Sequence, residues 1–120
     1  MHIILGSKAI IIAILYAFFT IPTADAADRV FVKYRGFVDR HHPELFCSYL
    51  KPSTFIKDIC YAPKTDYLIV KVKHTYYHYC GVPGNVALAW PKAPSLGRYY
   101  TYNIRGRYDC RYTGVIPDYG

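Results

Sequence analysis

The sequence predicts an α+β fold: a small antiparallel three-stranded meander packed by two short C-terminal helices, with an N-terminal edge strand and two disulfides. Three observations lead to this prediction. Apolar residues repeat with period two as far as Tyr79 and with helical spacing after Pro83, which is the change expected where strands give way to helices. The chain also has four cysteines, an even number that is typical of a disulfide framework in a small exported protein.

The first 26 residues are typical of a secretory signal peptide. Lys8 precedes an unbroken apolar run over residues 9–19, and Ala24-Asp25-Ala26 offers small residues at the minus three and minus one positions of a cleavage site. The run is too short to cross about 30 Å of hydrocarbon as a helix. We therefore expect cleavage after Ala26, a protein that is periplasmic or secreted, and no transmembrane anchor after processing. An uncleaved N-terminal anchor is the alternative.

The segment after the leader alternates apolar and basic side chains over residues 29–35, which predicts a short edge strand. Lys and Arg on such a strand discourage pairing with other chains. Gly36 ends the strand, and residues 37–43 are interpreted as a surface loop. Three apolar side chains are expected to dock onto the core beside Cys47: Leu45, Phe46 and Tyr49.

The predicted meander has three strands, over residues 54–61, 67–73 and 75–79. All three are rich in β-branched and aromatic residues, which suit a pleated, half-buried surface. The turn chemistry of residues 62–66 separates the first two strands, and His74 makes a tight turn between the second and the third.

Two short helices are expected after the sheet. The first covers residues 84–90 and is interrupted by Pro91, which lacks an amide hydrogen and clashes with the preceding turn. Ser95 can cap the second helix, and Gly106 ends it.

The four cysteines, Cys47, Cys60, Cys80 and Cys110, allow three sets of two bridges. If the strands that carry Cys60 and Cys80 flank a central strand, their backbones lie about 9–10 Å apart, which is farther than a disulfide spans. Two pairings remain. One joins Cys47 to Cys60 and Cys80 to Cys110, and the other joins Cys47 to Cys80 and Cys60 to Cys110.

Charge and aromatic content point to an anionic partner. Residues 1–26 contain one base and one acid, so the rest of the chain keeps the net charge of +7. Arginine forks pair with anions, and tyrosine rings offer planar surfaces for ring-bearing ligands. The residues expected to bind ligand are Tyr77, Tyr79, Arg98, Tyr99, Tyr102, Arg105 and Arg107.

Tyr77 and Tyr79 admit two interpretations. Because side chains alternate along a strand, the two rings share one face of the sheet, and Tyr76 and His78 take the other. The rings either pack under the helices or form a stacking platform for bases or sugar rings.

Three segments of this sequence resemble the KTSC domain. They are Tyr77-His78-Tyr79-Cys80-Gly81-Val82-Pro83, then Ala93-Pro94-Ser95-Leu96-Gly97-Arg98-Tyr99-Tyr100, and then Ile104-Arg105. The family has a central Tyr-x-Tyr motif, a Gly-Val-Pro, an Ala-x-Ser-x-Gly segment that leads into an aromatic pair, and an Ile-Arg. It occurs at the C-terminus of some lysyl-tRNA synthetases and as small stand-alone bacterial proteins, of which the exported four-cysteine kind is similar from about Lys33 to Arg111.

The resemblance implies a division of the chain. We expect a signal peptide (1–26), an N-terminal extension with an edge strand and a loop (27–52), a KTSC-like domain (53–112) and a C-terminal tail (113–120). It implies little about function, because the role of the family is not established and RNA binding was inferred from the synthetase context.

The sequence lacks the common motifs of catalysis, such as Gly-x-Ser-x-Gly and His-Glu-x-x-His. We therefore expect no enzyme, no cofactor and no metal, with a metal site that includes His41, His42 and Glu44 as the alternative. The expected function is an exported binding or envelope-associated module. Its expected partners are an anionic glycan, a lipid head group or nucleic acid, and a protein–protein module that binds an envelope protein is the other alternative.

Overall fold

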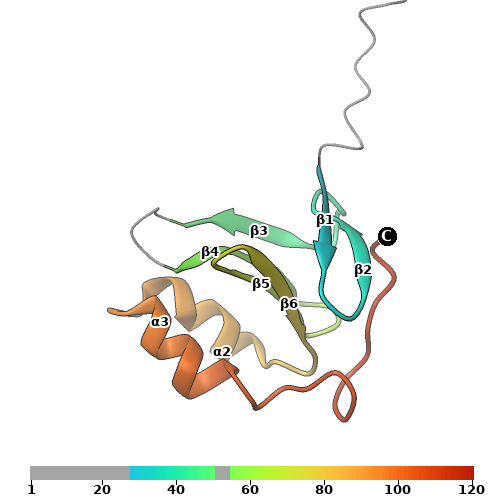
Figure 1. The fold of residues 1–120 in the computed structure, drawn as a ribbon. Coiled ribbons are helices and arrows are strands. Elements are labelled where there is room, and N and C mark those ends of the chain that lie inside the picture. The colour runs from blue at the N-terminus through green and yellow to red at the C-terminus, as the bar shows by residue number, and fades with distance from the viewer. Residues whose placement is uncertain (1–27, 51–54) are drawn as a thin grey trace, which may run out of the picture.

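A computed structural model describes residues 28–50 and 55–120, and it shows an α+β fold built on one curled sheet of six strands (Figure 1). The strands are β1 (Arg29–Val32), β2 (Gly36–Asp39), β3 (Phe46–Tyr49), β4 (Ile56–Ala62), β5 (Tyr67–Val72) and β6 (Thr75–Tyr79). Their order across the sheet is β2-β1-β6-β5-β4-β3. The α+β class is confirmed, but the predicted three-stranded meander is only the middle of a larger sheet. The predicted signal peptide lies outside the described residues.

Strands β4, β5 and β6 form the predicted meander. β5 pairs antiparallel with both neighbours, with Ile69 opposite Cys60 on one side and opposite His78 on the other. Leu68 and Ile69 point to opposite faces of the sheet, yet both are fully buried. Both faces of the central strand are therefore covered.

The N-terminal segment differs from its prediction. β1 is not an edge strand, because it pairs antiparallel with β2 and, through Val32 and Tyr76, parallel with β6. The predicted loop at 37–43 begins as strand β2. Gly36 has a φ of 105°, a value that glycine adopts at little cost, so the chain can reverse there and return along β1. The returning strand buries Val38 completely against the sheet.

Strand β3 lies at one edge of the sheet and pairs with β4. Leu45, just before it, is buried as predicted, but Phe46 and Tyr49 are 66% and 70% exposed. The expectation that all three side chains dock onto the core is wrong for these two. An edge strand has a neighbour on one side only, so less of its surface is covered.

The helices follow the order that the sequence predicts. They are α2 (Gly84–Ala89), the 3₁₀ turn η2 (Trp90–Lys92), α3 (Leu96–Tyr99) and the π-helical turn η3 (Tyr100–Ile104). Ser95 caps α3 by accepting a hydrogen bond from the Arg98 amide at 3.3 Å. Among residues 28–50 and 55–120, no helix has the length and apolarity that a membrane span needs.

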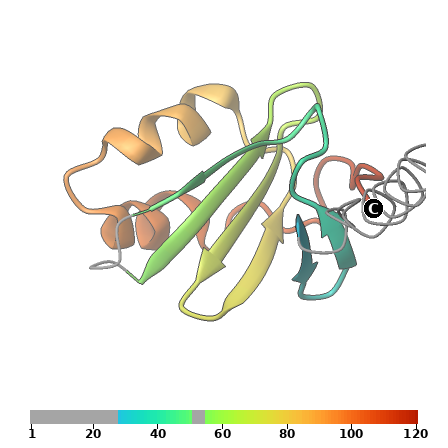
Figure 2. The same cartoon turned by 90° about the horizontal axis from the view of Figure 1, so that it is seen from above.

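Each face of the sheet has its own core. The helices cover one face (Figure 2). On this face Trp90 is fully buried and stacks on Tyr99 and Tyr100. The other face is covered by the β1–β2 hairpin and by the C-terminal tail, whose Tyr119 is buried in this second core. The tail crosses from the helical side to β2 (Figure 1). There the Asp39 amide donates to the Tyr119 carbonyl at 2.8 Å.

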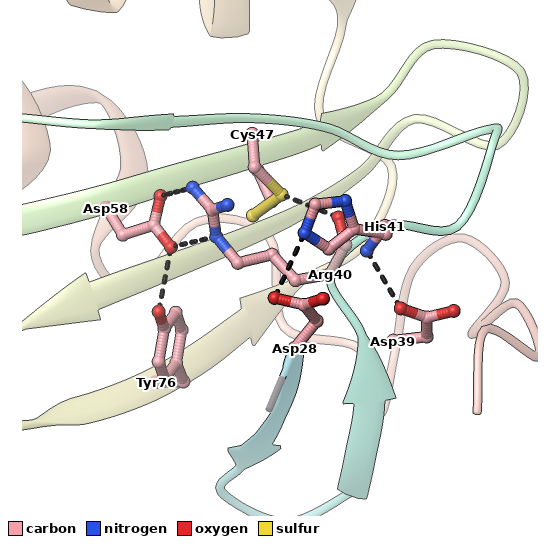
Figure 3. Close-up of polar contacts among 8 residues, drawn as sticks. Asp28, Asp39, Arg40, His41, Cys47, Asp58 and Tyr76 are labelled. Atoms are coloured by element: carbon pink, nitrogen blue, oxygen red, sulfur yellow. Dashed lines mark hydrogen bonds and ion pairs between the residues drawn. A yellow bond between two sulfur atoms is a disulfide. The ribbon is translucent and has the colours of Figure 1, made fainter. Parts of the chain in front are cut away.

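A buried ion pair lies in the second core (Figure 3). Asp58 on β4 is fully buried, and it accepts hydrogen bonds from Arg40 Nε at 2.8 Å and Nη2 at 3.0 Å. The Tyr76 hydroxyl donates to the same carboxylate at 2.7 Å. Burial and this bond raise the pKa of Tyr76, and the bonds to Asp58 raise the pKa of Arg40. The three residues fasten the segment after β2 to β4 and β6.

The structure decides between the two disulfide pairings. Cys47 is bonded to Cys60 and Cys80 to Cys110, and the described residues contain no free cysteine. The exclusion of a Cys60–Cys80 bridge is confirmed, because β5 lies between the strands that carry these residues.

Candidate ligand-binding hollow

A gap in the hydrogen bonding of β6 creates the candidate site. The Lys33 amide donates to the Tyr76 carbonyl at 2.9 Å, and the Cys80 amide donates to the Tyr108 carbonyl at 3.0 Å. Between these two bonds, this edge of β6 is paired neither with β1 nor with the C-terminal segment among the described residues. Backbone groups alternate in direction along a strand, so the amide and carbonyl of His78 point to the same side as those of Tyr76 and Cys80. Neither has a partner among the described residues.

A hollow of about 630 Å³ opens at this gap. Its walls are mainly apolar and come from three segments: the β1–β2 turn, β6, and the chain after η3. They include Tyr34, Tyr77, Tyr79, Tyr108, His78 and Ile116. The volume lies within the range of about 300–1,000 Å³ that is usual for small-molecule sites, which combine apolar walls with a few polar groups.

A chain of hydrogen-bonded side chains runs from Arg35 through Tyr67 to the ring of His78. Arg35 Nη1 donates to the Tyr67 hydroxyl at 3.3 Å, and that hydroxyl lies 2.8 Å from Nδ1 of His78. Burial raises the pKa of Tyr67 to about 12, so the hydroxyl keeps its proton and can donate it to Nδ1. Burial and the charge of Arg35 lower the pKa of His78. When the hydroxyl donates to Nδ1, the neutral ring carries its hydrogen on Nε2, which has no partner among the described residues.

Charged groups surround the mouth of the hollow. The ammonium of Lys33 lies 5.1 Å from the centre of the Tyr34 ring and 5.7 Å from that of Tyr77. Arg111 binds Asp109 through Nε and Nη2, with the shortest contact at 2.7 Å. Hydrogen bonds from Arg111 lower the pKa of Asp109 to about 2, so this carboxylate is ionised at any physiological pH. Asp109 and Arg111 offset each other, and Lys33 adds a positive charge beside Tyr34 and Tyr77.

Tyr34 is held in an unusual backbone conformation. Its φ is 72°, which places a bulky residue in the left-handed region, and its side chain is 83% exposed. The ring makes no hydrogen bond to another described residue that would offset this backbone strain. The ring lines the hollow, and the ammonium of Lys33 lies beside it.

The seven predicted ligand-binding residues are not gathered in one place. Tyr77 and Tyr79 line the hollow, and the charge of Arg105 acts on the hydroxyl of Tyr79. The Tyr79 hydroxyl is 2.5 Å from that of Tyr100, so this ring also packs under the helices, as one interpretation predicted.

The other four predicted residues lie elsewhere. Arg98 and Tyr102 line a second hollow, of about 830 Å³, between α3 and the residues that flank the undescribed segment 51–54. Tyr99 lies between the helices and donates to the Val86 carbonyl at 2.6 Å. Arg107 donates through Nε to the Tyr102 carbonyl at 2.8 Å.

Sequence reasoning did not assign ligand contacts to Lys33, Tyr34, His78 or Asp109. The pairing of Cys80 with Cys110, one of the two that the sequence allowed, is the signal that places Asp109 beside Tyr79. No comparable signal marked Tyr34, because its role depends on the parallel contact between β1 and β6.

The free energy of unfolding is expected to fall as the pH is lowered from 7 to 5, in part through His78. The folded protein holds this histidine at a lowered pKa, so the unfolded chain takes up the proton first, near pH 6.5. Stability decreases with acidity wherever the unfolded state binds more protons. Asp109 contributes to the pH dependence only below about pH 4, because its pKa is also lowered.

Urea denaturation at pH 7 and pH 5 measures this effect. His78→Gln should reduce the difference between the two midpoints, whereas His74→Gln, at an exposed turn, should leave it unchanged. An undiminished difference in His78→Gln would show that other groups cause the pH dependence.

Comparison with known proteins identifies the middle of the chain. Residues 52–108 match the KTSC domain family. The chain is also similar to the crystal structure of a KTSC domain protein from Yersinia pestis, with 26% sequence identity and a TM-score of 0.50 over 54% of this chain and 92% of that one. No curated protein matches the sequence. Residues 52–108 of this chain are therefore a KTSC domain.

Proposed function

We propose that this protein is an exported, non-enzymatic binding module that holds an anionic ligand in the hollow at the edge of β6. The observation that supports the proposal most is where the hollow lies. Tyr77, His78 and Tyr79 come from the KTSC domain, whereas Tyr34 and Arg111 come from the segments before and after it. The added segments thus complete a site that the family domain alone would leave open on one side.

The disulfides support the same view. Each bridge has one cysteine inside residues 52–108 and one outside, so both fasten an added segment to the KTSC domain. Cys110 itself lines the hollow between Asp109 and Arg111. Disulfides persist in oxidising compartments, which agrees with the expected export.

The charges around the hollow favour an anion. Lys33 lies beside the Tyr34 ring, Arg111 lines the hollow, and the charge of Arg105 acts on the Tyr79 hydroxyl. All three cations are exposed, so their attraction for an anion should depend on salt. A planar ring with a negative group can stack on tyrosine while a cation pairs with the charge.

Two matched variants test where an anion binds. The probes are oligogalacturonate, vesicles that contain phosphatidylglycerol, and oligouridylate, each titrated at low and high salt. Lys33→Gln/Arg111→Gln should weaken binding by about tenfold or more, a loss of about 1.4 kcal/mol. Arg98→Gln/Arg107→Gln removes the same net charge from side chains that do not line the hollow, so it should change the affinity much less. Equal losses in both variants, or no binding of any probe at low salt, would reject the proposal.

A protein partner at β3 is the second candidate. β3 is an edge strand with two exposed aromatic side chains, Phe46 and Tyr49, and extended peptides can pair with such edges. Pull-down from envelope extract at high salt tests this candidate, because strand pairing should survive salt that weakens contacts with anions.

A further inference from the structure

The polar groups in the hollow call for a ligand that both donates and accepts hydrogen bonds. His78 offers two donors, its backbone amide and Nε2, and one acceptor, its backbone carbonyl. None of the three is bonded to another described residue. Asp109 adds carboxylate oxygens at the mouth. A hydroxyl group can donate and accept at once, so a ligand with several hydroxyls on one ring can satisfy these groups together.

Asp109 also favours binding of sugars over binding of phosphate-rich ligands. The carboxylate is ionised and lines the hollow, where it can accept hydrogen bonds from hydroxyls but has no donor for a phosphate oxygen. Arg111 is already paired with Asp109, whereas Lys33 and Arg105 have no hydrogen-bonded acid among the described residues. This balance suits one negative group on the ligand better than several.

The walls fit the faces of a sugar ring. The C–H groups on such a face are apolar and slightly positive, and they pack on the electron-rich face of an aromatic ring. Tyr34 provides an exposed ring of this kind and keeps it at a backbone angle that glycine would adopt more easily. A bulky side chain at such a position, with no hydrogen bond to another described residue, points to contact with a ligand.

We propose that the hollow binds an acidic sugar, a pyranose ring that carries one carboxylate, with Tyr34 stacked on the ring and His78 bonded to its hydroxyls. This inference rests on the proposed function and narrows it. Lys33 pairs with the sugar carboxylate beside Tyr34 and Tyr77. The neighbouring hydroxyls meet the amide, the carbonyl and Nε2 of His78. Asp109, still held by Arg111, accepts from a further hydroxyl.

Trigalacturonate and its methyl ester form the first test. The two probes have the same rings and hydroxyls and differ in charge. We expect the acid to bind at least about tenfold more tightly than the ester. In amide-resolved NMR titrations of the oxidised protein, the backbone amide of His78 should shift with the acid, and the amides of Arg98 and Tyr102 at the second hollow should not.

Tyr34→Gly tests the stacking residue. Glycine relieves the positive φ but adds freedom to the unfolded chain, and these effects oppose each other, so the melting temperature should change little. Binding of trigalacturonate should fall at least about tenfold. Phe37→Ala is the matched control, because Phe37 is an exposed aromatic residue on the same hairpin that does not line the hollow.

The outcomes separate the two levels of the proposal. If oligouridylate binds in a Tyr34-dependent manner and trigalacturonate does not, the sugar assignment is overturned and the anion-binding module stands. Equal affinity for the acid and its ester overturns the acidic part of the assignment. If no anionic probe binds, or if binding is the same in Tyr34→Gly and in Lys33→Gln/Arg111→Gln as in the wild type, both proposals are overturned.

Discussion

Replacing Asp58 with Asn is expected to lower the free energy of unfolding by about 3–5 kcal/mol, the usual cost of breaking a buried ion pair from one side. Asp58 is completely buried, and the side chain of Arg40 is 11% exposed. The substitution keeps the shape of the side chain but leaves the guanidinium without its counter-charge in the second core. It also weakens the bond that the Tyr76 hydroxyl makes at 2.7 Å. The β1–β2 segment should therefore detach most easily.

Urea denaturation of the oxidised protein measures this loss. Glu44→Gln is the control, because Glu44 and Lys64 form a more exposed ion pair at 3.3 Å whose removal should cost no more than about 1 kcal/mol. The double variant Arg40→Met/Asp58→Leu should be less destabilised than Asp58→Asn, since no buried charge remains unpaired. A loss below about 1 kcal/mol in Asp58→Asn would contradict the assigned role of the pair.

Removing the second disulfide, by Cys80→Ala/Cys110→Ala, is expected to lower the free energy of unfolding by about 3–4 kcal/mol. The bridge closes a segment with a sequence separation of 30 that contains both helices. It also holds the chain after η3 against β6, where a Cβ on Gly114 would come within 2.5 Å of the Gly81 amide nitrogen. Without the bridge this close packing loosens, and the wall formed by Tyr108 and Asp109 moves with it. Binding in the hollow should fall along with stability.

Removing the Cys47–Cys60 bridge separates the loss of stability from the loss of binding. Cys47→Ala/Cys60→Ala should cost about 3 kcal/mol, because its sequence separation is 13 and loop closure depends weakly on length. This bridge joins β3 to β4, and neither of its cysteines lines the hollow. The affinity for anionic probes should therefore stay close to that of the oxidised wild type. Loss of binding in this variant alone would contradict the position assigned to the site.

Much of the fold could be predicted because the signals are local. The meander, the interruption at Pro91 and the cap at Ser95 each depend on a few consecutive residues, and each appears where it was expected. The hairpin of β1 and β2 could not be predicted in this way. Its strands are four residues long, and they are stabilised by contacts with Tyr76 and Tyr119, far away in the sequence.

The candidate site follows the same division. Tyr77 and Tyr79 were recognised because strand periodicity puts two rings on one face, and both line the hollow. Arg98 and Tyr102 were grouped with them because they belong to the same basic and aromatic stretch of sequence. The turns of α3 and η3 direct them to a different hollow. Arginines and tyrosines that alternate in the sequence therefore do not all lie close together in the structure.

The sequence by itself determined the α+β class, the order of the three meander strands and the helices after them, the KTSC resemblance and the exclusion of a Cys60–Cys80 bridge, since these follow from periodicity, turn chemistry, local motifs and strand spacing. Only the tertiary structure decided the remaining pairing of cysteines, the burial of Asp58 with Arg40, and the gap at His78 that Tyr34 and Arg111 enclose. The physical reason is that these features join the KTSC domain to the segments before and after it. Such contacts depend on how the three segments pack, and not on the neighbouring residues in the sequence.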